Sequence, residues 1–161
     1  MLVASVNRTN KLDKQLQEIS SRIHAHDMIN DRVSKSAVGW HIEHVLLAIN
    51  RIIAALEKSN PSDYRWQFNI NRLIIFKIRR IPRGRAKSPK VVLPKSYSEE
   101  SLQSHLEKTR NYIKLLENIG PDKYFAHPYF GNLRLIKTVT FLEIHTDHHL
   151  RIIRDIVNAH Q

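Results

Sequence analysis

Cysteine is missing from this chain of 161 residues, and only four glycines occur. The lack of cysteine excludes disulfides, thiolate metal ligands and a cysteine nucleophile. The scarcity of glycine, together with the rarity of alternating apolar and polar residues, favours long helices joined by few turns. The sequence therefore predicts an all-α fold.

Long uncharged apolar runs are also missing. No stretch approaches the roughly 18 to 20 apolar residues that a membrane-spanning helix requires, and the N-terminal stretch MLVASVNRTNKLDKQ becomes polar too early for a signal peptide. We therefore expect a cytoplasmic protein with no membrane partner. Its length is that of a single domain, residues 1–161, which can bury its own core.

Acidic residues are missing from one segment of a strongly basic chain. Between Tyr64 and Ser98 there are ten lysines and arginines and no aspartate or glutamate, and these ten supply most of the net charge of +11. A small anionic partner is expected to bind there, and we interpret Arg83, Arg85 and Lys87 as a rim that collects it. The alternative is a solvated loop that its charge keeps soluble.

Apolar residues recur every three or four positions in four segments, which is the spacing of amphipathic helices. These segments are about 9–30, 35–58, 97–119 and 133–159. Between the second and the third lies a basic connection of about 60–97, in which prolines leave room only for a short helix at about 64–79. The expected architecture is a four-helix bundle with one long crossover connection between helices 2 and 3.

Polar residues mark the expected starts of the four helices. The candidate N-caps, in chain order, are Thr9 or Asn10, Ser34 or Ser36, Ser98 and Asn132. Ser98 is followed three residues later by Ser101, which predicts a capping box, although Glu or Gln is the usual residue at that position.

Histidines interrupt the apolar faces of the second and fourth helices. His145 and His149 are four residues apart, so both project from one face of the last helix. His41 and His44 are three residues apart, and either could meet that pair from the second helix. Three imidazoles around one ion would leave a coordination position for water or substrate, as in catalytic metal sites. The alternative is a set of core histidines that other polar groups satisfy.

Two longer motifs resemble a known family. WHIEHVLLAI in the second helix and HPYFGNLRLIKTVTFLEIHTDHHLRII near the C-terminus resemble the DinB-like (YfiT-like) superfamily of metal-binding four-helix bundles, in particular a branch of unknown function with a basic Pro-Arg-Gly loop. The resemblance covers most of the chain from about Ser36 onward. It implies that His44, His145 and His149 bind a divalent ion, and it leaves His41 as the alternate ligand.

The resemblance also implies a chemistry. Characterised members of the superfamily look like thiol-dependent S-transferases and isomerases or metal hydrolases that use zinc, nickel or similar ions. A bound metal lowers the pKa of a thiol or water and so supplies a nucleophile. His148 and His127 are the candidate catalytic residues. His148 would flank the site, where it supports a ligand or contacts the substrate. His127 could stand at the mouth of the site as an acid, a base or a substrate contact, unless it belongs to an aromatic plug that closes the bundle. A low-molecular-weight thiol with carboxylates would suit the basic rim.

Two other functions fit parts of the sequence. A nucleic-acid-binding or anion-binding protein could act through residues 65–95, but that segment has no recognition-helix motif and lacks the aromatic interleaving of single-strand binders, so a nucleic-acid partner is not favoured. A degenerate bundle could also pack its histidines without metal. A homodimer is the default assembly, because closed two-fold assemblies are the commonest.

Overall fold

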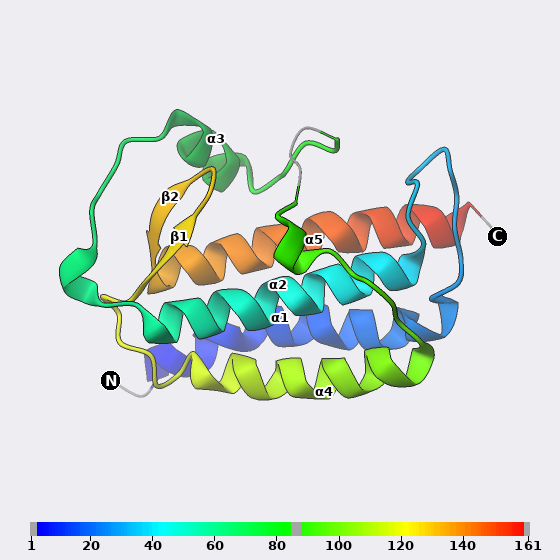
Figure 1. Cartoon of the computed structure of the whole chain (residues 1–161), viewed down its shortest axis with the longest axis horizontal. Coiled ribbons are helices and arrows are strands. Elements are labelled where there is room, and N and C mark those ends of the chain that lie inside the picture. The colour runs from blue at the N-terminus through cyan, green and yellow to red at the C-terminus, as the bar shows by residue number, and fades with distance from the viewer. Residues whose placement is uncertain (1–2, 85–87, 160–161) are drawn as a thin grey trace.

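Four long helices lie side by side and form the body of the molecule (Figure 1). They are α1 (Val3–Arg22), α2 (Val38–Lys58), α4 (Glu99–Leu115) and α5 (Leu135–Asn158). The computed structural model describes residues 3–84 and 88–159, with side chains from residue 9 onward. α1 and α2 each pack against both α4 and α5. The prediction of a mainly helical chain is confirmed.

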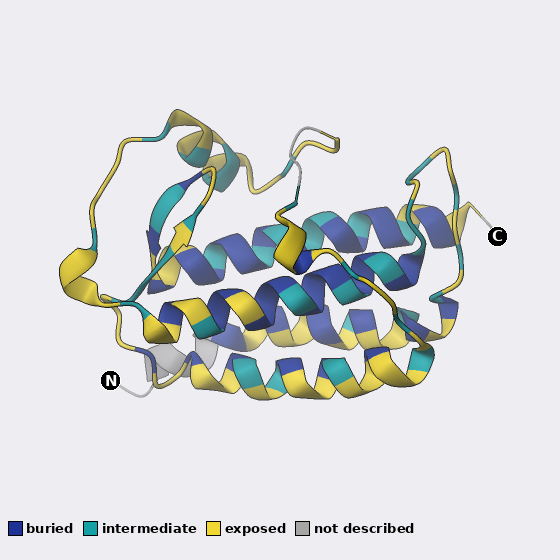
Figure 2. Cartoon of the chain, in the orientation of Figure 1, coloured by how far each residue is buried: buried dark blue, intermediate teal, exposed yellow. Residues whose placement is uncertain are grey.

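The apolar stripes of these helices form the core. Leu12, Leu16 and Ile19 of α1 are fully buried, and α2 is buried over most of its length because two long helices and part of the following connection cover it (Figure 2). This burial places His41 and His44 of α2 inside the molecule, with 4% and 1% of their surfaces exposed. None of the helices that the structure describes is long and apolar enough to cross a membrane.

A short hairpin joins α4 to α5. Strands β1 (Tyr124–His127) and β2 (Gly131–Arg134) pair antiparallel, with Ala126 opposite Asn132, and both strands contact α5. The all-α prediction is therefore incomplete at this connection, where we expected only turns and aromatic residues. Strands of four residues are too short to show an alternating pattern in the sequence. Gly131 has a φ of +70°, a conformation that favours glycine, at the start of the second strand.

The capping box at the start of α4 is confirmed, and the other expected caps are wrong. The Ser98 hydroxyl accepts the N–H of Ser101 at 3.2 Å, and the Ser101 hydroxyl accepts the N–H of Ser98 at 2.8 Å. α1 begins before its expected caps, and the N-cap residues of α2 and α5, Ala37 and Arg134, form no side-chain cap bond. The misplaced candidates are Thr9 and Asn10 within α1, Ser34 and Ser36 before α2, and Asn132 in β2.

The connection from α2 to α4 contains, after the 3-10 helix η2 (Pro61–Asp63), a short α-helix that is tied to the hairpin. This helix, α3 (Ile70–Ile78), is shorter than the predicted one because its first turn is capped by Asn69, whose side-chain oxygen accepts the N–H of Arg72 at 2.8 Å. The Arg72 guanidinium donates to the carbonyl oxygen of Phe130 at 2.9 Å. These bonds fix the orientation of α3 relative to β1 and β2.

The second half of the connection returns across α2. Its short 3-10 helix η3 (Lys90–Val92) contacts α2, and the Val92 side chain is buried. Further on, the Tyr97 ring lies against Gly39, where any Cβ would overlap the ring. This close approach brings an otherwise irregular segment onto the buried part of α2, beside His44.

Candidate metal centre

Three histidine side chains from α2 and α5 converge inside the molecule. The ring centroids of His44, His145 and His149 form a nearly equilateral triangle, with separations of 5.1, 4.7 and 4.8 Å. Each residue offers a ring nitrogen that lies within 4.8 Å of the other two. His44 and His149 are buried, and His145 is partly buried. This buried group could hold a metal ion.

The orientation of His44 is set by the connection that crosses α2. Its Nδ1–H donates to the backbone carbonyl of Val92 at 2.7 Å, and the Trp40 ring stacks on its imidazole at 5.2 Å. Because Nδ1 carries the proton, Nε2 keeps a lone pair, and this atom points at Nε2 of His145, 3.2 Å away. A backbone carbonyl behind an imidazole is the usual way in which proteins select the tautomer of a metal-binding histidine.

His145 has no competing partner for its lone pair. Its Nε2 faces His44, and its Nδ1 is buried without a hydrogen-bond partner among the described residues. A buried imidazole nitrogen without a partner is unfavourable. An ion that accepted lone pairs from the Nε2 atoms of His44 and His145 would fit this pair, with Nδ1 of His145 as the protonated nitrogen.

His41, the alternate ligand, lies behind His149 rather than in the group of three. Nδ1 of His41 is 2.9 Å from Nδ1 of His149, and Nε2 of His41 is 2.9 Å from the hydroxyl oxygen of Ser34. The same hydroxyl oxygen accepts the backbone N–H of Ser36 at 3.1 Å. If His149 donates its Nδ1 proton to His41, its Nε2 keeps a lone pair, and His41 then donates to Ser34. His41 is therefore a partner of a candidate ligand.

Burial keeps the imidazoles neutral. It lowers the pKa of His41 to about 4 and that of His44 below its ordinary value. Burial, and then the neighbouring histidines, hold the pKa values of His145 and His149 well below 6.5. The neutral form is the one that binds metal ions, so the group is ready to bind one at neutral pH.

His148 connects this group to a cavity lined by arginines. Its ring centroid is 5.0 Å from that of His149, and its Nδ1–H donates to the carbonyl oxygen of Ile81 at 3.1 Å. The cavity has a volume of about 330 Å³. Its lining residues are Arg80, Ile81, Pro82, Arg83, His148, Arg151 and Asp155.

The arginines of this cavity differ in their partners. Arg83 pairs with Asp155 at 2.6 Å, and Arg151 pairs with Asp147 one turn earlier on α5. Arg80 has no ion pair within the described part of the chain. Of the predicted anion rim, Arg83 does line the cavity, whereas Arg85 and Lys87 lie outside the described residues.

Three groups at the site were not predicted from the sequence, namely Arg80, Arg151 and the Val92 carbonyl. Arg151 could have been found, because it follows His148 by three residues on one helix. No sequence pattern marks a backbone carbonyl that reaches a residue 48 positions away.

His127 is separate from the three converging histidines. Its Nδ1 accepts the backbone N–H groups of Tyr129 and Phe130 at 3.0 and 3.2 Å, so it holds the turn of the hairpin. Its ring centroid lies 4.5 Å from the ring centroids of both Phe130 and Phe141. Burial lowers its pKa to about 4. These contacts fit the aromatic-plug interpretation better than a role as acid or base.

Comparisons of the chain with protein-family models, with curated proteins and with solved structures give no match. The function is therefore inferred from the geometry of the site.

Proposed function

We propose that this chain is a metal-dependent enzyme of the DinB-like type, and that its four long helices are the bundle of that superfamily. His44, His145 and His149 would hold one divalent ion, zinc or nickel. The observation that carries the proposal is the convergence of three neutral imidazoles, with the His44 tautomer selected by Val92 so that a lone pair faces the group. Three protein ligands leave a position open for substrate, as in catalytic sites.

The chemistry would be S-transfer or hydrolysis. The ion, when bound, lowers the pKa of a thiol or water at the open position. The chain supplies the binding site for the substrate, in which Arg80 and Arg83 bind a carboxylate in the adjacent cavity. His148 lies between that cavity and His149. A small anionic thiol that spans these two places would have its sulfur near the three imidazoles.

The other functions have less support. A metal-free degenerate bundle could satisfy Nε2 of His44 with an N–H of His145, but it would give no reason for His149 to converge on the same pair. Nucleic-acid binding through residues 65–95 would give no account of the three converging histidines. A homodimer remains a prediction from general frequency alone.

Replacing Arg83 with alanine should weaken the binding of an anionic thiol. We expect the Kd of mercaptosuccinate for the metal-loaded protein to rise about tenfold, because a charge-assisted hydrogen bond is lost. Isothermal titration calorimetry measures this, with Arg51→Ala, an exposed arginine of α2, as the control. An unchanged Kd in Arg83→Ala would rule out the cavity as the carboxylate site.

Replacing His41 with alanine should weaken metal binding without removing a ligand. We expect the affinity for zinc to fall about 10–100-fold, the usual cost of losing the group behind a metal-binding histidine. Competition with a chromogenic chelator gives the affinity. His41→Asn is the matched variant, because its side-chain oxygen can take the place of Nδ1 as acceptor for His149 and should restore much of the affinity. Equal losses in both variants would contradict this role of His41.

A further inference from the structure

The outward face of α3 is apolar, although nothing in the described structure covers it. Ile70, Leu73, Ile74 and Ile78 recur at helical spacing, and about half of the surface of each is exposed, from 49% to 56%. Figure 2 shows exposed residues over much of this helix. A helix on the surface of a soluble domain normally turns its polar side to water. This face therefore resembles a surface that meets a partner.

The orientation of α3 is fixed, so the exposed face does not result from a loosely attached helix. Its opposite face carries Ile75 and Phe76, which pack against the core. The Phe76 ring lies 5.9 Å from that of Phe130. Together with the bond from Arg72 to the hairpin, these contacts leave the four aliphatic side chains no way to turn inward. Trp66 and Phe68, each 68% exposed, precede the same helix.

Basic residues lie within this apolar face and beside it. Lys77 lies within the face, Arg80 follows the end of α3, and Lys137 of α5 lines the same cavity as Lys77. No acidic residue occurs between positions 64 and 98. Unlike Lys77 and Lys137, Arg79 forms an ion pair, with Glu143 of α5. The face is thus an apolar patch with a basic border.

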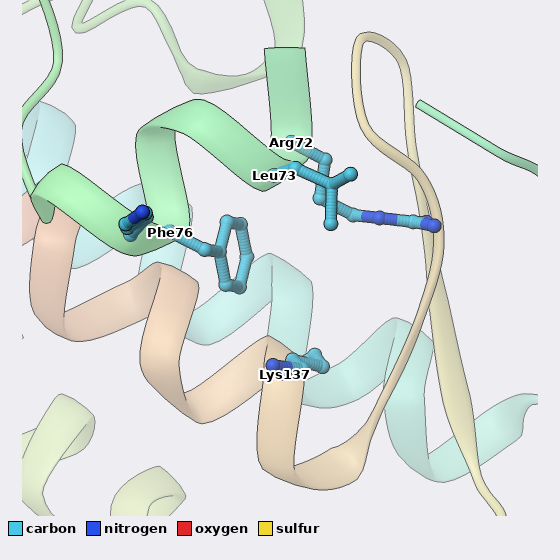
Figure 3. A pocket seen from close by; sticks show the side chains of 5 residues that line it. Arg72, Leu73, Phe76 and Lys137 are labelled. Carbon is cyan, nitrogen blue, oxygen red and sulfur yellow. The ribbon is translucent and has the colours of Figure 1, made fainter. Parts of the chain in front are cut away.

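A small open cavity lies beside this face, between α3 and α5 (Figure 3). It measures about 260 Å³, and its lining residues are Arg72, Leu73, Phe76, Lys77 and Lys137. Phe76 points from α3 toward the side of Lys137, whose ammonium lies 5.7 Å from the aromatic ring. Lys77 and Lys137 form no ion pair within the described residues. Two ammonium groups beside an apolar wall suit a phosphate attached to an acyl chain.

We propose that α3 docks this protein on the surface of a bilayer that contains anionic phospholipids. Aliphatic and aromatic side chains would enter the boundary between headgroups and acyl chains, while the lysines and arginines meet lipid phosphates. The prediction of no membrane partner rested on the lack of a segment that can span a bilayer. Peripheral docking needs no such segment.

The positive charge of the α3 face favours an anionic lipid surface over a second copy of the chain as its partner. An isologous contact through α3 would place Lys77 and its basic neighbours against the same residues of the partner, with no acidic group in this segment to offset them. Nucleic acid would engage the cations but would leave Ile70, Leu73, Ile74 and Ile78 without a partner. A lipid surface satisfies both the charged and the apolar groups.

Cosedimentation of the full-length protein with vesicles tests the proposal. We expect binding to vesicles of phosphatidylcholine mixed with phosphatidylglycerol, weaker binding at high salt, and little binding to phosphatidylcholine alone. The double variant Leu73→Gln, Ile74→Gln should lower the partition about tenfold or more. Lys77→Glu, Lys137→Glu should do the same. Leu115→Gln, which changes an exposed leucine of α4, is the control.

Several outcomes would overturn the proposal. They are no binding to either vesicle, equal binding to both, and binding that the Leu73→Gln, Ile74→Gln variant leaves unchanged. A concentration-dependent dimer that the same variant dissociates would assign the face to a second copy instead. Both substituted side chains are half exposed, so circular dichroism should show an intact fold in the variant.

Discussion

The His149→Ala variant is expected to lose its bound metal, from about one divalent ion per chain to background. His149 is buried and supplies one of the three converging nitrogens, so its loss leaves only His44 and His145 on the site. The affinity should fall by more than the 10–100-fold expected for a group behind a ligand. Elemental analysis after purification with added zinc or nickel gives the stoichiometry, and chelator competition gives the affinity.

The matched control for this variant is His24→Ala. His24 is exposed in the 3-10 helix η1 (Ile23–Ala25) that follows α1, so the variant should retain the full metal content. Thermal unfolding of the metal-free proteins separates loss of the ligand from loss of the fold. A wild-type protein that holds no ion under these conditions, or a His149→Ala protein that holds as much as wild type, would refute the metal site.

The second large effect is acid destabilisation of the metal-free protein. His41 and His127 have pKa values of about 4 in the folded state, against 6.5 for an unperturbed histidine. Between these values the unfolded chain binds protons that the folded chain does not bind. The free energy of unfolding therefore falls as the pH drops from about 6.5 to 4, by about 3 kcal/mol for one such histidine. Above pH 6.5 both states are neutral and the stabilisation is complete.

Several buried histidines contribute to this effect in the same direction. His44, His145, His148 and His149 also have lowered pKa values. His41 and His127 alone, at about 3 kcal/mol each, reach the lower end of the 5–15 kcal/mol that stabilises a typical domain, so we expect unfolding before about pH 4. Urea titrations at a series of pH values, with a chelator present, measure the slope.

A variant of His127 measures the contribution of one histidine to this pH dependence of the free energy of unfolding. His127→Asn keeps an oxygen that can accept the N–H groups of Tyr129 and Phe130 but removes the titrating ring. The variant should take up about one proton fewer on unfolding between pH 6.5 and 4. Its free energy of unfolding should therefore change less steeply with pH, by up to about 1.4 kcal/mol per pH unit. A stability that stays flat over this pH range would contradict the burial of neutral histidines.

Helical periodicity accounts for what could be predicted of the fold. The stripes of α1, α2, α4 and α5 are long enough to show a period of 3.6, and the ends of α2 and α5 agree with the expected segments within a few residues. The strands around Ala126 and Asn132 are too short to show any period. Caps failed at three helices because a helix start depends on local turns that a single polar residue does not determine.

The sequence by itself determined that His145 and His149 share a face, because four residues make about one turn of a helix. Only the tertiary structure decided which histidine of α2 meets them. His44 does, because the connection that follows α2 returns across it and places the Val92 carbonyl on Nδ1, while His41 contacts His149 from behind. The same holds for the arginine cavity beside His148, since contacts between segments far apart in the chain depend on packing rather than on local spacing.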